Sequence, residues 1–160
     1  MFKKLVKFYA FLTRKLRKFK NSDNEVYKLS AEEFARKLNE MDYKADPLGG
    51  FIDYVADPDK FFDPKRKFGR DCDDWARQWS IWGLHHDYIA EEYIVYNPKH
   101  PFKTMHVVTI LWKDASCYLA NYYLYGPFQS NEDALNYLKN YKSYKDGLET
   151  IFSRREVFHS

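Results

Sequence analysis

Cysteine is scarce in this 160-residue sequence, which holds only Cys72 and Cys117. Two cysteines are too few for a disulfide framework, and either can serve as a free thiol in a reducing compartment. The longest apolar run among the first 20 residues spans only residues 8–12, too short for a membrane span or the apolar part of a secretory signal. The sequence therefore predicts a cytoplasmic protein, with peripheral membrane association as the alternative.

Three further features are missing: a Gly-rich phosphate-binding loop, a Cys-x-x-Cys pair and an internal repeat. What the chain does contain is hydrophobic residues at 45% and aromatic residues at 19%, among them 14 Tyr and 13 Phe. This composition excludes a disordered chain, and a chain of this length can bury a real core. The many flat side chains predict a filled core or a lined cleft, without naming a ligand.

Positive charge is concentrated at one end of the chain. Residues 1–20 hold eight Lys or Arg and no acid, and the other 140 residues hold 18 basic against 23 acidic side chains. The main part of the chain is therefore mildly acidic, and we expect no nucleic-acid partner for it. The change in composition predicts two parts, a basic segment with its linker at 1–22 and a domain at 23–160.

Residues 2–20 show the spacing of a basic amphipathic helix, with apolar residues recurring every three or four positions. Three interpretations stay open. The helix packs its apolar side on the domain, or it binds a membrane surface carrying anionic lipid, or it docks on a partner molecule. A polar stretch at 21–24 follows it and is predicted to be a short linker.

A cysteine stands where a glycine-marked loop is predicted to turn into a helix, in the sequence Gly69-Arg70-Asp71-Cys72-Asp73-Asp74-Trp75-Ala76. With Asp71 as N-cap, Cys72 lies in the first turn of a helix over 72–83, where the helix dipole favours a thiolate. The carboxylates of Asp73 and Asp74 act against this, because a nearby negative charge raises the pKa of a thiol. A buried structural cysteine is the alternative interpretation.

Three strand-like runs follow, at 88–96, 104–112 and 117–125, and the connection at 113–116 predicts a hairpin between the last two. This hairpin sets His106 and Asn121 on neighbouring strands, where an amide can orient an imidazole. His85 and His86 are the rival histidines, but they lie a helix length from Cys72 and are expected at a solvated helix end.

The remaining elements are predicted to be scaffold. A capping box at Ser30 starts a second helix, and Ser130 with Asp133 starts another over 131–141. The long connection over 44–70 is expected to wall one side of a cleft beside the cysteine. Gly126-Pro127 is expected to end the sheet, and the tail from residue 142 to add a last helix or an edge strand.

The cysteine motif resembles that of the transglutaminase-like cysteine hydrolase superfamily, in which a glycine precedes the cysteine and an acid and a small residue follow it. Residues 69–128 carry the resemblance, with Gly69, Asp71 and Asp74 supporting the motif and His106-Val107-Val108 resembling the family's histidine strand. It implies an α+β fold with a papain-like core, in which the cysteine-bearing helix packs against a small antiparallel sheet. Asn121 departs from the Asp common in the family, and Arg70 adds a bulky cation two residues before the cysteine.

The resemblance implies a cysteine-dependent hydrolase or acyltransferase acting on a peptide, isopeptide or other amide bond of a protein or peptide substrate. Cys72 would be the nucleophile, His106 the base and Asn121 the residue that orients it. No cofactor is expected. Two alternatives remain: a degraded binding module tethered through residues 2–20, and a metal site built from Cys72, His106 and nearby acids, for which no ligand pair with typical spacing is present.

Overall fold

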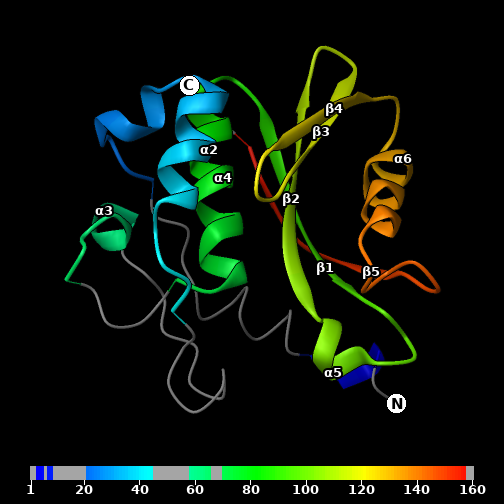
Figure 1. Ribbon diagram of the computed structural model, residues 1–160. Helices are drawn as coiled ribbons and strands as arrows, with labels where there is room; N and C mark the ends of the chain where they lie inside the picture. The colour runs from blue at the N-terminus through cyan, green and yellow to red at the C-terminus, as the bar shows by residue number, and fades with distance from the viewer. Residues whose placement is uncertain (1–2, 6, 9–20, 45–57, 66–69, 158–160) are drawn as a thin grey trace.

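The computed structural model describes residues 3–5, 7–8, 21–44, 58–65 and 70–157 (Figure 1). Most of the predicted N-terminal helix, most of the connection over 44–70, and Gly69 lie outside these residues. The described chain combines helices with one antiparallel sheet, which confirms the mixed helix-and-sheet class.

The sheet has five strands in the order β4-β3-β2-β1-β5 (Figure 1). The strands are β1 (Ile89–Tyr96), β2 (His106–Lys113), β3 (Ser116–Ala120), β4 (Leu124–Phe128) and β5 (Glu149–Glu156). Every neighbouring pair is antiparallel, and β2 and β3 form the predicted hairpin. The tail therefore forms a strand rather than a helix, and β5 lies at an edge of the sheet.

Helices cover both faces of the sheet. The helical elements are η1 (Glu25–Lys28), α2 (Ala31–Asn39), α3 (Pro58–Phe61), α4 (Cys72–His85), α5 (Pro101–Thr104), α6 (Asn131–Asn136) and η3 (Tyr137–Asn140). Helices α4 and α2 lie on one face of the sheet, and α6 lies on the other face (Figure 1). The predicted capping box at Ser30 is present, and the Ser130 side chain accepts a hydrogen bond from the Asp133 N–H, as expected.

Alternation along β2 divides the core between the two faces. Leu111 packs with the α2 and α4 side chains, including Phe34 and Trp79. Val108 and Ile110 pack with residues of α6 on the opposite face. Both sides of β2 are thus buried, which explains why its sequence is a nearly continuous apolar run.

Several predicted boundaries were wrong. Gly83 is buried inside α4 rather than ending it, because α4 and β2 approach so closely that a Cβ on Gly83 would lie 2.5 Å from Leu111 Cδ2. The third strand ends at Ala120, and Gly126-Pro127 lies within β4 instead of ending the sheet. A proline is tolerated there because β4 is an edge strand. The helix predicted over 131–141 is split into α6 and η3.

Candidate functional site

The three residues selected from the sequence line one cavity. Cys72, His106 and Asn121 all contribute to the wall of a cavity of about 400 Å³ at the N-terminal end of α4. Most of the other lining side chains are large and apolar or aromatic: Met41, Tyr43, Trp75, Trp79, Met105 and Tyr122. The cavity therefore combines a thiol, an imidazole and a carboxamide with an apolar lining.

His106 and Asn121 are joined by a hydrogen bond. His106 is the first residue of β2, and Asn121 directly follows β3, beyond the last paired residues of the hairpin. His106 Nε2 lies 2.9 Å from Asn121 Oδ1. Because Oδ1 can only accept, Nε2 carries the proton and Nδ1 is left as the basic nitrogen. The ring is thereby held in the tautomer that a general base requires.

Burial lowers the pKa of the His106 imidazole below its ordinary value, and the hydrogen bond that the ring donates to Asn121 partly offsets this effect. Burial disfavours the charged imidazolium, whereas an acceptor on Nε2 favours it. His106 is therefore neutral at pH 7 and able to take up a proton.

Cys72 begins α4, with Asp71 in the N-cap position as predicted, although the Asp71 side chain makes no capping hydrogen bond. Burial, followed by the charges of Asp73 and Asp71, raises the pKa of the Cys72 thiol to about 12. The backbone N–H of Val107 donates toward the sulfur and acts in the opposite direction. Of the two acids expected to oppose the thiolate, Asp73 does so, while the second contribution comes from Asp71 rather than Asp74. The resting thiol is therefore protonated.

Three aspartates lie within two residues of Cys72 in the sequence. Carboxylate oxygens of Asp71, Asp73 and Asp74 lie within 4.8 Å of one another. Within the described residues this is the one group with the composition of a metal site, and neither Cys72 nor His106 belongs to it. The ligand set suggested from the sequence, a thiol and an imidazole with acids, is not assembled in this part of the chain.

Two hydrogen bonds join the cysteine helix to the elements that carry His106 and Asn121. Thr109 Oγ1, three residues after His106, donates to the Ala76 carbonyl at 2.8 Å, one turn after Cys72. Trp79 Nε1 donates to the Asn121 carbonyl at 2.7 Å. The relative position of the thiol, the imidazole and the carboxamide is thus fixed by core hydrogen bonds.

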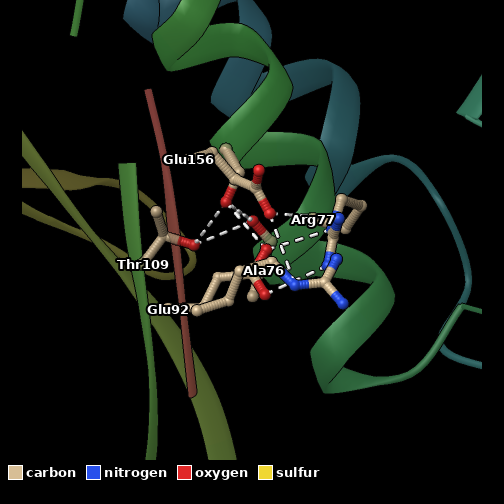
Figure 2. A network of polar contacts seen from close by, with 7 residues as sticks. Ala76, Arg77, Glu92, Thr109 and Glu156 are labelled. Carbon is tan, nitrogen blue, oxygen red and sulfur yellow. Dashed lines mark hydrogen bonds and ion pairs between the residues drawn. The ribbon is translucent and has the colours of Figure 1, made fainter. Parts of the chain in front are cut away.

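A buried polar network extends the first of these bonds (Figure 2). Arg77 Nε lies 3.0 Å from Glu92 Oε1, and Ser80 Oγ lies 2.9 Å from the same carboxylate oxygen. Farther along, Arg154 Nε lies 3.3 Å from Glu156 Oε1. Because these residues come from α4, β1 and β5, the network attaches the helix to the side of the sheet that β1 and β5 form.

The segment before the cysteine is held against the cavity by a short bridge. Lys44 and Arg70 exchange two backbone hydrogen bonds of 3.1 Å, which places the neighbouring Tyr43 in the cavity wall. Burial, and then the nearby Cys72, raise the pKa of the Tyr43 phenol to about 12, although the residue as a whole is 65% exposed. A phenol group therefore lies close to the sulfur.

Arg70, the unexpected cation before the cysteine, does not line the cavity. Its side chain is buried, and its guanidinium donates to the Phe61 carbonyl at 2.8 Å and to the Asp63 carbonyl. These contacts direct the positive charge toward α3 and away from the thiol. Arg70 is therefore a structural anchor for the loop that precedes Cys72.

The rival histidines have structural contacts at the other end of α4. His85 Nε2 lies 2.6 Å from the Ser22 carbonyl, and His86 Nε2 lies 3.1 Å from the Tyr27 carbonyl. Both rings also stack on aromatic neighbours. They hold the segment around η1 and do not line the cavity with Cys72.

The described part of the N-terminal segment is helical over residues 3–5 and 7–8. Leu5 and Phe8 are more than half exposed, and Lys3 Nζ lies 3.5 Å from Glu149 Oε2 of β5. In the residues that the structure describes, no helix combines the length and apolar character needed to cross a bilayer. Binding of residues 2–20 to a membrane surface or to a partner protein stays a prediction.

Comparison with protein-family models, with curated proteins and with solved structures gave no match for this chain. The site therefore rests on its own geometry. Sequence reasoning selected Cys72, His106 and Asn121, but it missed Tyr43 and Thr109. Tyr43 precedes the long connection and has no motif of its own, whereas the position of Thr109 on the α4 side of β2 follows from strand alternation.

Proposed function

We propose that this chain is a cysteine-dependent hydrolase that cleaves an amide bond through an acyl-enzyme on Cys72, with a transglutaminase-like core. The observation that carries the proposal is the 2.9 Å hydrogen bond between His106 Nε2 and Asn121 Oδ1 in the wall of the cavity that holds Cys72. A thiol, a base and a residue that orients the base form the arrangement of nucleophilic catalysis.

In the proposed reaction the Cys72 sulfur attacks the carbonyl carbon of the amide while His106 Nδ1 takes up the thiol proton. The C–N bond then breaks, the amine leaves with the proton from the imidazolium, and a thioester remains on the sulfur. Water, deprotonated by the neutral imidazole, attacks the thioester, and the thiol takes the proton back. An amine in place of water would give acyl transfer, but hydrolysis is the simpler outcome because it needs no second bound substrate.

Both groups of the resting pair are neutral, so the base must act during the attack. The pKa of the Cys72 thiol is raised to about 12 and that of His106 is lowered, which disfavours a preformed thiolate–imidazolium pair. Proton transfer concerted with sulfur attack is the route open to such a pair.

The same raised thiol pKa favours a second candidate, a binding module on this fold. A thiol kept protonated by burial and by Asp73 and Asp71 is a poor nucleophile, whereas the apolar cavity still accepts a ligand. In that case the residues 2–20 would attach the module to a membrane surface or partner protein.

Iodoacetamide alkylation of Cys72 over pH 6–11, followed by mass spectrometry, separates the two candidates. For the hydrolase we expect the reaction at neutral pH to fall at least about tenfold in His106→Ala, because the base is removed. His86→Ala is the matched control, since that ring contacts Tyr27 and lies away from the cavity. Equal alkylation of all three proteins would contradict the hydrolase and leave the binding module.

A further inference from the structure

A second cavity adjoins the first at the His106–Asn121 pair. It measures about 280 Å³ and shares Met105, His106, Asn121 and Tyr122 with the first cavity, while Cys72 lines only the first. Its other walls are formed by Lys103, Thr104, Leu138, Tyr141, Ser143 and Tyr144. The imidazole therefore lies between two spaces, and the thiol opens into one of them.

Strand alternation explains this arrangement. His106 is on the same side of β2 as Val108 and Ile110, which pack toward α6, whereas Cys72 begins the helix on the other face. Because His106 is the first residue of β2, its ring lies at the end of the sheet, where the spaces of the two faces meet.

The chemistry of acyl transfer assigns a different half of the substrate to each cavity. This step rests on the proposed function. The acyl half becomes bonded to Cys72 Sγ and must occupy the first, apolar cavity. The leaving amine receives its proton from His106 Nδ1, so its nitrogen lies beside the sulfur, and the rest of the leaving half extends from there past the imidazole, away from the acyl half. The second cavity is the space available there.

The charged side chains around the second cavity indicate which kind of ligand it accepts. Among the described residues that line it, Lys103 is the one charged side chain, and no acid is present. Residues 137–145, which supply Leu138, Tyr141, Ser143 and Tyr144, add Lys139, Lys142 and Lys145 and no acid. A volume just below the range of about 300–1,000 Å³ typical of small-molecule sites suits a single residue.

We propose that the second cavity holds the leaving half of the substrate and that this half carries a carboxylate, as the C-terminal residue of a peptide does. The reaction then releases one amino acid: the amide C–N bond breaks, a C–S bond forms on Cys72, the amine takes the proton from His106, and water later cleaves the thioester. Lys103 is the residue that selects the carboxylate.

Two peptide pools of the form Ac-X-X-Gly test this inference, where X is an equimolar mixture of Leu, Phe and Tyr. One pool ends in a free carboxylate and the other in a carboxamide. Release of glycine and glycinamide is measured by mass spectrometry, and binding to the Cys72→Ala variant is measured by calorimetry. Because Lys103 is exposed, we expect a preference of about threefold for the carboxylate pool in both measurements.

Lys103→Glu should remove or reverse this preference, whereas Lys139→Glu, the same charge change outside the cavity wall, should retain it. Cys72-dependent release without a preference would overturn this inference and leave the hydrolase standing. Preferential binding without release would support the cavity assignment and contradict the hydrolase. Equal binding together with no release would contradict both.

Discussion

At the scale of single residues, the site depends on which protonation states its surroundings permit. Burial raises the pKa of the Cys72 thiol and lowers that of the His106 imidazole, so each group is held in its neutral form. Asn121 adjusts the pKa of the imidazole, and the charges of Asp73 and Asp71 together with the Val107 N–H adjust that of the thiol. Substitutions at those positions should therefore shift the pH dependence in directions that can be stated in advance.

The acid side of the pH–rate profile reports the state of His106. Activity should fall as pH falls through the lowered His106 pKa, with a midpoint below the ordinary value of 6.5, because a protonated imidazole accepts no proton. Asn121→Ala removes the hydrogen bond that raises this pKa, so the midpoint should move to lower pH and kcat should fall roughly 10–100-fold as the ring loses its orientation. Asn121→Asp should move the midpoint to higher pH. A profile of kcat/KM that neither variant shifts would exclude His106 as the base.

The reactivity of the thiol should increase when a neighbouring negative charge is removed. Asp73 is the first of the charges that raise the Cys72 pKa, so Asp73→Asn should lower this pKa. We expect roughly two- to fivefold faster alkylation of Cys72 at pH 8, where the thiolate fraction limits the rate. Asp87→Asn, at the other end of α4, removes an exposed carboxylate and should leave the rate unchanged. A slower reaction in Asp73→Asn would show that this carboxylate assists the thiol instead.

At the scale of elements, the distance between the cysteine helix and the histidine strand is set inside the core. Thr109 on β2 bonds to Ala76 on α4 (Figure 2), and Trp79 on α4 bonds to the Asn121 carbonyl. Both donors are buried, so neither bond competes with water. Cys72 and His106 begin their elements and Asn121 directly follows β3, so all three depend on this internal attachment.

Thr109→Val replaces the hydroxyl with a methyl group of the same size and removes the donor to Ala76. We expect a loss of about 1–2 kcal/mol in the free energy of unfolding, because a buried carbonyl loses a partner. We also expect a fall in kcat without a change in the pH midpoint, since the titrating groups remain. Thr150→Val, on the partly buried β5, is the control and should change neither quantity. Urea denaturation and steady-state kinetics give the two measurements.

The elements could be predicted from the sequence where their signals are local. The capping box at Ser30 and the helix start at Cys72 depend on neighbouring residues, and both are present. The end of α4 could not be predicted, because Gly83 is required by contact with Leu111 on another element. The sequence places Asn121 within a strand over 117–125, but its bond to His106 is made from the bend at 121–123 that follows β3, which periodicity does not report.

At the scale of the whole molecule, charge and core belong to different parts of the chain. Both faces of the sheet are buried by helices of the main domain, and among the residues that the structure describes none before Val26 belongs to the hydrophobic clusters on the two faces. The excess positive charge lies in residues 1–20, and without it the chain carries five more acidic than basic side chains. The two parts should therefore be separable.

Deleting residues 1–20 should change the free energy of unfolding by less than about 1 kcal/mol, since the Lys3–Glu149 contact is an exposed ion pair. Alkylation of Cys72 should be unchanged, and binding to anionic lipid vesicles should be lost with the eight basic residues. Circular dichroism and vesicle co-sedimentation test this. A truncated chain that unfolds would instead establish that the helix packs on the domain.

The position of Trp75 has a practical consequence. Its indole lies in the cavity wall, edge-on to Tyr122, with the buried Trp79 behind it, whereas Trp82 is enclosed in the core and Trp112 packs on the opposite face. A molecule that enters the cavity changes the surroundings of two of the four tryptophans and leaves Trp82 and Trp112 as an internal standard. The protein thus carries its own fluorescent reporter of occupancy, and candidate substrates can be ranked by emission before any product has been identified.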